Sequence, residues 1–203
     1  MVNQTLLDIA MNHADGLIIK AQSGDNDSFN RLVSLWYKRI YNYCYKYAGS
    51  HDLAMDITQN TFIAVHQKLG QLRDVARFKP WLYRIAINCG NEELRKQRRI
   101  AGLVISEDGG EAENPGLQVS DDLRYQPDST LQRQEIAELI LEALQTLPEE
   151  QRIVVIMKEY EGLKFREIAD ALAISENTAK SRLYYGLKHL RGKLSHIMNE
   201  NKN

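Results

Sequence analysis

The chain has 203 residues, 43% of them hydrophobic, and a formal net charge of −1. This length allows one large domain or two small ones with packed cores. No apolar run reaches the length of a membrane-spanning helix, and the N-terminus lacks the basic start of a signal peptide, so a membrane or secreted protein is not expected.

The sequence gives little support for an enzyme. Its five histidines are scattered and no C-x-x-C pair is present, so no metal site is predicted. A phosphate-loop glycine pattern and a G-x-S-x-G motif are both absent. The two cysteines, Cys44 and Cys89, lie on predicted core faces, which is typical of buried, reduced thiols in a cytosolic protein.

Helical periodicity predicts four helices in the first half of the chain. Their expected ranges are 15–23, 28–48, 52–68 and 78–99. The third helix has an exposed polar face with Asp52, Asp56, Gln59 and Asn60. This face is either a solvated acidic surface or a surface for a partner.

The fourth predicted helix combines an aromatic residue with cations and amides. Trp81, Arg84, Asn88, Asn91 and Arg95 recur on one face at steps of three and four. Such a face offers single-stranded nucleic acid a plane for base stacking, cations for phosphates and amides for base edges. Spacing alone leaves open whether Trp81 is instead half-buried core.

Charge is distributed unevenly along the middle of the chain. Residues 73–99 hold eight Lys or Arg and three acids, whereas residues 101–130 hold seven acids and a single Arg. Residues 100–129 also have weak periodicity and several Gly and Pro. This segment is predicted to be an extended, flexible, acidic linker that marks a domain boundary.

The second half begins with a predicted helix at residues 130–146, whose inward residues include Ile136. Pro148 suits the first turn of the next helix, which is expected to end at Gly162 with Tyr160 on its core side. No segment shows strand alternation followed by a hairpin turn, so the expected fold class is all-α.

Residues 163–194 predict two helices joined by a tight turn. Ser175 can cap the second helix, and Ala169 is small enough for the point where the helices cross. A stripe predicted to be buried runs along the second helix at Ala179, Leu183, Leu187, Leu190, Leu194 and Ile197. The opposite side is basic and polar, an arrangement typical of a helix-turn-helix whose second helix enters a major groove.

Three blocks of the sequence resemble bacterial RNA polymerase sigma factors of the extracytoplasmic-function group. They are D-L-A-M-D-I-T-Q-N-T-F at residues 52–62, F-K-P-W-L-Y-R-I-A-I-N at residues 78–88, and the helix-turn-helix stretch at residues 147–191. Met55 and Asn60 stand where this family has acids. The resemblance covers nearly the whole chain after its first dozen residues.

The resemblance implies two helical domains and assigns roles to their residues. Residues 1–14 would be a tail, 15–99 region 2, 100–129 the linker that threads polymerase channels, and 130–198 region 4. Core polymerase would bind Asp52, Asp56, Gln59 and Phe62. The −10 element would be held as a single strand by Arg73, Arg77, Lys79, Trp81, Tyr83, Arg84, Asn88, Asn91 and Arg95, with a flipped base at the loop before the fourth helix. The −35 element would be held as a duplex by Ser175, Asn177, Thr178, Lys180, Ser181, Arg182, Tyr185 and Lys188.

The same resemblance implies a cytoplasmic protein that binds core RNA polymerase, promoter DNA and an anti-sigma factor, without a cofactor, a small-molecule substrate or catalysis. Two other classes compete with it. A stand-alone helix-turn-helix regulator would explain the duplex-binding helix but not the Trp81 face or the acidic spacer. A scaffold that binds only protein would leave both basic faces without a role.

Overall fold

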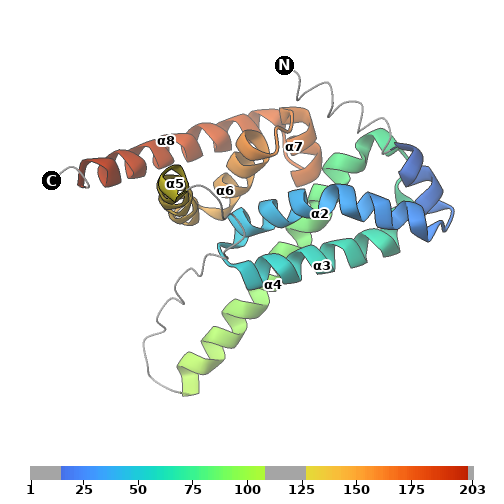
Figure 1. The fold of residues 1–203 in the computed structure, drawn as a ribbon, viewed down its shortest axis with the longest axis horizontal. Helices are drawn as coiled ribbons and strands as arrows, with labels where there is room; N and C mark the ends of the chain where they lie inside the picture. The colour runs from blue at the N-terminus through green and yellow to red at the C-terminus, as the bar shows by residue number, and fades with distance from the viewer. Residues whose placement is uncertain (1–14, 108–126, 201–203) are drawn as a thin grey trace.

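The computed structural model describes residues 15–107 and 127–200, and the regular structure of these residues is entirely helical (Figure 1). A short helix at residues 15–22 comes first. The later elements are α2 (Asn26–Ala48), α3 (His51–Lys68), η1 (Leu69–Gln71), η2 (Val75–Arg77), α4 (Phe78–Glu107), α5 (Pro127–Gln145), α6 (Glu149–Val155), η3 (Ile156–Tyr160), α7 (Phe165–Leu172) and α8 (Glu176–Glu200). The all-α prediction is confirmed.

Helices α2, α3 and α4 form the core of the N-terminal half. Their inward faces bury large side chains such as Ile40, Tyr43 and Leu82, each with at most 1% of its surface exposed. Gly90 on α4 lets the two helices approach closely, because a Cβ atom there would lie 2.5 Å from the Tyr47 ring of α2. Periodicity predicted these faces but not the need for a glycine at that contact.

The C-terminal half is a helix-turn-helix supported by α5, α6 and a π-helical turn, η3. Helix α8 lies close against α6, since a Cβ atom at Gly186 would come within 2.8 Å of the Val155 side chain. The η3 segment continues α6 and delivers the chain to Gly162, whose φ is +62°. Left-handed backbone of this kind favours glycine, and it ends the helix where the sequence predicted.

Two predicted helix ends are wrong in extent. Helix α4 continues to Glu107 rather than ending at Arg99, and α5 begins at Pro127 rather than Thr130. The apolar stretch after residue 99 supports helix, whereas the weak periodicity, the Gly and Pro and the acids of residues 100–129 as a whole favour a linker. Residues 1–14 and 108–126, which hold the predicted tail and most of the predicted linker, lie outside the described residues.

Three side chains predicted to be buried are exposed. Ile136 on α5 is 54% exposed, Tyr160 42% and Leu187 on α8 41%. Tyr160 ends the π-helical turn, and a π turn rotates a side chain away from the position that a 3.6-residue period assigns to it. Leu187 follows the buried Gly186, which faces α6 in its place.

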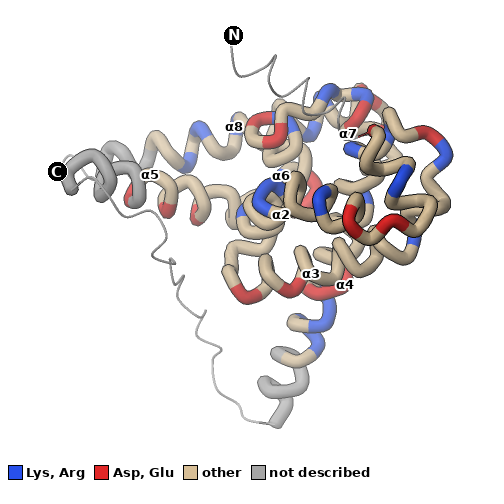
Figure 2. Tube along the Cα trace, turned by 45° about the vertical axis from the view of Figure 1, so that its right-hand side comes forward, with Lys and Arg blue, Asp and Glu red and all other residues tan. Residues whose placement is uncertain are grey.

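The two halves pack against each other and share one hydrophobic core cluster, which contains both Tyr43 from α2 and Met157 from η3. Helix α7 lies against α4, and α5 and η3 lie against α2 (Figures 1 and 2). Sequence patterns did not predict this packing. None of the described helices is long and apolar enough to cross a membrane.

Candidate nucleic-acid interface

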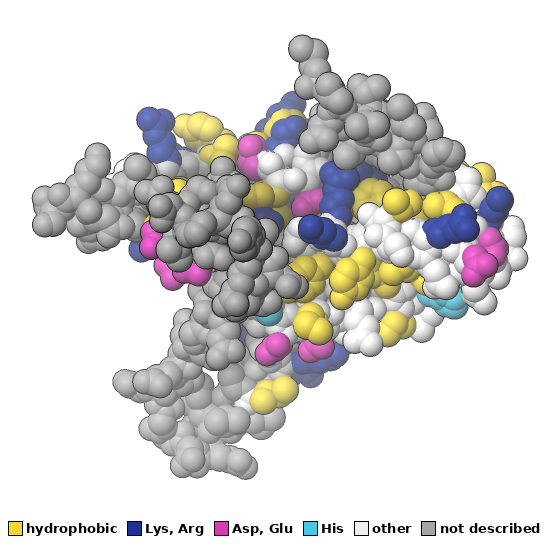
Figure 3. All heavy atoms as spheres, in the orientation of Figure 1, with side chains coloured by type: hydrophobic (Ala, Val, Ile, Leu, Met, Phe, Trp, Pro, Cys, Tyr) yellow, Lys and Arg dark blue, Asp and Glu magenta, His cyan; other side chains and the backbone are white. Residues whose placement is uncertain are grey.

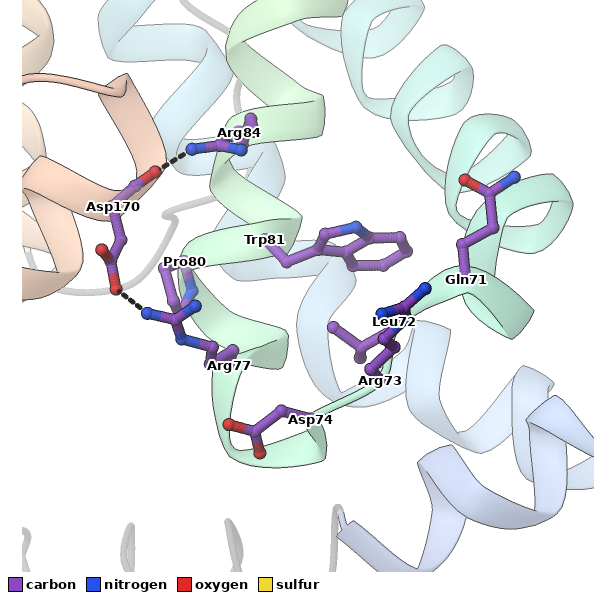
Figure 4. A pocket seen from close by; sticks show the side chains of 9 residues that line it. All are labelled: Gln71, Leu72, Arg73, Asp74, Arg77, Pro80, Trp81, Arg84 and Asp170. Carbon is purple, nitrogen blue, oxygen red and sulfur yellow. Dashed lines mark hydrogen bonds and ion pairs between the residues drawn. The ribbon is translucent and has the colours of Figure 1, made fainter.

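A pocket of about 290 Å³ opens beside the N-terminus of α4. The loop that forms one wall is fixed by Asp74, whose side chain accepts a hydrogen bond of 3.0 Å from the Ala76 backbone. Figure 4 shows the nine lining residues, which are Gln71, Leu72, Arg73, Asp74, Arg77, Pro80, Trp81, Arg84 and Asp170. The family resemblance implied a base pocket at this loop. The structure has a pocket there, and its use for a base stays a prediction.

The indole of Trp81 forms the apolar wall of this pocket. It is half-buried, and its inner side packs on Phe78 with 6.0 Å between ring centroids. Phe78 in turn contacts Trp36 edge-on at 5.7 Å. Trp81 therefore combines both readings of its spacing: it is anchored in the core and also presents a ring surface to the pocket.

Cations and amides continue from this pocket along the exposed face of α4. Arg84, Asn88, Asn91 and Arg95 are all exposed. The Asn91 amide contacts the Tyr47 hydroxyl, so it is partly engaged within the chain. Lys79 is half-buried, and burial lowers the pKa of its ammonium group, with Glu167 acting in the opposite direction.

Tyr83 does not belong to this exposed face. Its side chain is fully buried, and its hydroxyl donates a hydrogen bond of 2.5 Å to Glu161 from the other half of the chain. Burial raises the pKa of Tyr83 well above its usual value, and the Glu161 carboxylate raises it further. In this arrangement Tyr83 holds the two halves together and cannot contact DNA.

Both helices of the helix-turn-helix are capped, and the cap of α8 at Ser175 is the one that the sequence predicted. The Lys164 backbone donates to the Glu167 side chain at 2.7 Å, and the Ser175 hydroxyl accepts from the Thr178 backbone at 3.0 Å. Ala173 occupies the turn with φ at +54°, in the left-handed region where glycine would be less strained. Ala179 is fully buried where α7 and α8 cross.

Most of the predicted −35 residues lie on the open face of α8. Ser175, Asn177, Lys180, Ser181, Tyr185 and Lys188 are exposed, and Thr178 is partly exposed. Arg182 differs, because it forms an ion pair of 2.5 Å with Glu150 of α6 and is only 24% exposed. Arg182 thus links α8 to α6 in this structure. Helical spacing alone could not tell this role from contact with DNA.

The predicted polymerase-binding face lies on α3. Asp52, Asp56 and Gln59 are exposed on it, together with the apolar Met55 and Ile63. Figure 3 shows hydrophobic side chains gathered over α2 and α3. Phe62 is 8% exposed and stacks on Tyr37 at 6.0 Å, so it supports this surface from beneath rather than forming part of it.

Five of the nine lining residues were not among the predicted −10 residues: Gln71, Leu72, Asp74, Pro80 and Asp170. Gln71 and Leu72 directly precede the basic loop and could have been included on that ground. Asp170 comes from α7, about ninety residues further along the chain, and no sequence pattern connects it to the loop. Both cysteines are free, and burial raises the pKa of the Cys44 thiol to about 12, as expected for an inert thiol.

Comparisons with known proteins agree with this arrangement. Residues 32–100 match the family described as Sigma-70 region 2, and residues 134–190 match Sigma-70, region 4. The chain is 26% identical over 183 residues to the ECF RNA polymerase sigma-E factor of Haemophilus influenzae, covering 90% of this chain and 95% of the relative. It is 29% identical to the ECF RNA polymerase sigma factor SigW of Bacillus subtilis, with 87% and 94% covered.

Solved structures show the same fold. The chain is similar to CnrH, solved in complex with the cytosolic domain of CnrY, with a TM-score of 0.65, 21% identity, and 90% of this chain and 97% of that chain covered. It is also similar to the sigma factor RpoE of Bartonella quintana, solved with the anti-sigma factor NepR, with a TM-score of 0.62, 21% identity, and 82% and 96% covered. Both regions occur in the same order along most of the chain, and the protein belongs to the extracytoplasmic-function group of the sigma-70 family of RNA polymerase sigma factors.

Proposed function

We propose that the chain binds core RNA polymerase, recognises the −35 and −10 promoter elements and initiates transcription. One observation supports this most strongly. A single chain carries two surfaces of different chemistry: a helix-turn-helix suited to duplex DNA, and an aromatic pocket with a cationic helix suited to a single strand. Transcription initiation requires both, because duplex must be recognised and then opened.

In this function the protein catalyses no reaction. Its first task is to bind −35 duplex with the open face of α8, where Lys180 and Asn177 are free to reach base edges or phosphates. Its second task is to hold unpaired −10 bases, one of them against Trp81, while Arg77 and Arg84 receive the backbone. Stacking contributes about 1–3 kcal/mol per base, which offsets the few kcal/mol needed to unstack one.

The α3 face is the proposed docking surface for core polymerase. It mixes the carboxylates of Asp52 and Asp56 with the exposed apolar side chains of Met55 and Ile63. A patch with apolar centre and charged surroundings is typical of protein interfaces. The site of action is then the cytoplasm, where the polymerase is, and the partners named for CnrH and RpoE support an anti-sigma factor as a regulator of this chain as well.

Reversing a charge on this face tests the docking surface. We expect Asp56→Lys to weaken binding to core polymerase at least about tenfold, or about 1.4 kcal/mol, because a cation would replace the carboxylate at the contact. The measurement is the concentration at which labelled protein co-elutes with core polymerase. Glu142→Lys is the control, since it makes the same charge change on an exposed position of α5. If the two variants bind core polymerase with equal affinity, α3 is not part of the interface.

A stand-alone helix-turn-helix regulator is the second candidate. It requires tight duplex binding without polymerase, usually by a dimer on a symmetric site. The pocket at Trp81 and the α4 face have no role in such a protein, and this favours the sigma factor.

A further inference from the structure

The helix at residues 15–22 contacts the segment that forms one wall of the Trp81 pocket. Its last residue, Gln22, is half-buried. The Gln22 side-chain nitrogen donates to the Leu69 backbone oxygen at 2.9 Å and to the Leu72 backbone oxygen at 2.7 Å. These two carbonyls lie at the start of η1 and directly after it. Gln22 therefore ties both ends of this turn to a helix that comes 47 and 50 residues earlier in the chain.

A glutamine suits this position because its amide nitrogen carries two N–H groups, one for each carbonyl. Helix α3 ends at Lys68, and carbonyls at and beyond a helix end need partners from outside the helix. The Leu72 backbone N–H donates to the Leu69 oxygen at 3.1 Å, which closes the turn locally. A glutamate has the same shape as glutamine, but it has no N–H to donate and would repel both oxygens.

The helix that carries Gln22 is itself fixed to the core of the N-terminal half. Ile18, one turn before Gln22, is 1% exposed and belongs to the same core cluster as Leu72. After the helix the chain turns back, and the Asp25 backbone N–H donates to the Lys20 backbone oxygen at 3.1 Å. The Gln22 amide is thus held on a packed helix, and it can fix the carbonyls opposite.

The segment that Gln22 fixes supplies part of the pocket lining. Gln71, Leu72 and Arg73 all line the pocket, and in Figure 4 the Trp81 indole extends toward them. A base stacked on Trp81 would have its edge near the Gln71 amide and the Arg73 guanidinium, which are both exposed. Hydrogen bonds weaken steeply with distance and angle, so the choice between bases depends on where these two side chains are held.

We propose that Gln22 is a positioning residue for base selection in the −10 pocket. It acts through the backbone of η1, by fixing where Gln71 and Arg73 lie relative to the Trp81 ring. The inference rests on the proposed function of this pocket. It gives the helix at residues 15–22 a part in promoter recognition, although this helix precedes residues 32–100, which match Sigma-70 region 2.

Gln22→Met tests this in holoenzyme assembled from the full-length chain and core polymerase. Methionine has nearly the same length as glutamine and removes both donors. The probes are fluorescent single-stranded oligonucleotides from the −10 region of a promoter that the holoenzyme transcribes, with each of the four bases at each position. At the position whose base enters the pocket, the ratio between the affinities for the best and the worst base should fall about three- to tenfold, roughly the loss of one hydrogen bond.

The ratio between bases separates positioning from stability, because a partly unfolded variant loses affinity for all bases alike and keeps their ratio. Gln97→Met is the matched control, since it makes the same substitution at an exposed position of α4 that is not among the predicted −10 residues. Gln22→Lys restores N–H donors on a long side chain and should recover most of the base preference.

If Gln22→Met melts far below the parent, Gln22→Asn takes its place, because the shorter amide cannot reach both carbonyls and should lose part of the base preference. An unchanged ratio in the folded variant, or an equal loss in Gln97→Met, would overturn the inference while the parent still selects −10 bases and the proposed function stands. A parent holoenzyme that binds all the oligonucleotides alike would overturn the proposed function and this inference with it.

Discussion

Replacing Trp81 with alanine should leave −35 binding nearly intact and lower the yield of open promoter complex about 5- to 150-fold, the effect of losing roughly 1–3 kcal/mol of stacking. The reason is geometric, since Trp81 supplies the ring surface of the pocket while the helix-turn-helix lies elsewhere. The measurement is permanganate reactivity of unpaired thymines in holoenzyme–promoter complexes. Trp81→Phe keeps an aromatic plane and should retain an intermediate yield.

A thermal melt accompanies this measurement, because Trp81 packs on Phe78 and its removal leaves a cavity. A variant that melts near the parent temperature and still fails to open the promoter supports the stacking role. If folded Trp81→Ala opens promoter DNA like the parent, Trp81 serves only the core.

Replacing Lys180 with alanine should weaken −35 engagement by about 1–3 kcal/mol, or roughly 5- to 150-fold, if its ammonium group reaches a base edge. The residue is exposed on the open face of α8, one turn after the Ser175 cap. Low-temperature footprinting of the closed complex measures the loss of upstream protection. The permanganate reactivity of thymines, measured per closed complex, should be unchanged. This is the reverse of Trp81→Ala, which should keep −35 binding and lose thymine reactivity.

The control for this variant is Lys193→Ala, an exposed lysine further along the same helix. Lys180 also lies over the Phe165 ring at 5.7 Å, so the melting temperature is compared as well. A small loss of DNA binding that is equal on all promoter sequences would show that Lys180 contacts only phosphate. If both variants protect the −35 element equally well, the contact with this element lies on another face of the protein.

Helix order and local chemistry could be predicted from the sequence because both depend on near neighbours. The cap at Ser175, the backward cap from Glu167 and the strained turn at Ala173 follow from residue type and spacing over a few positions. The fold class was predicted on the same basis. The pocket at the basic loop was implied by the family resemblance, which rests on a motif in which loop and helix are contiguous.

Contacts between distant segments could not be predicted. Helical spacing identifies a face but not the element that covers it, so Tyr83 was assigned to DNA and is instead buried against Glu161. Arg182 was counted as a DNA contact because its pairing with Glu150 depends on how α8 crosses α6. The docking of α7 on Arg84 joins residues 87 positions apart, and no local pattern encodes it.

Start-site mapping with reconstituted holoenzyme tests the central claim most directly. The purified chain is added to core RNA polymerase lacking any other sigma factor, and genomic DNA fragments are transcribed in vitro. The proposed function predicts transcripts that begin at defined positions downstream of shared −35 and −10 sequences, and that disappear when the chain is left out. No specific transcripts, together with tight binding of the isolated chain to a symmetric duplex site at physiological salt, would contradict it and favour a stand-alone regulator.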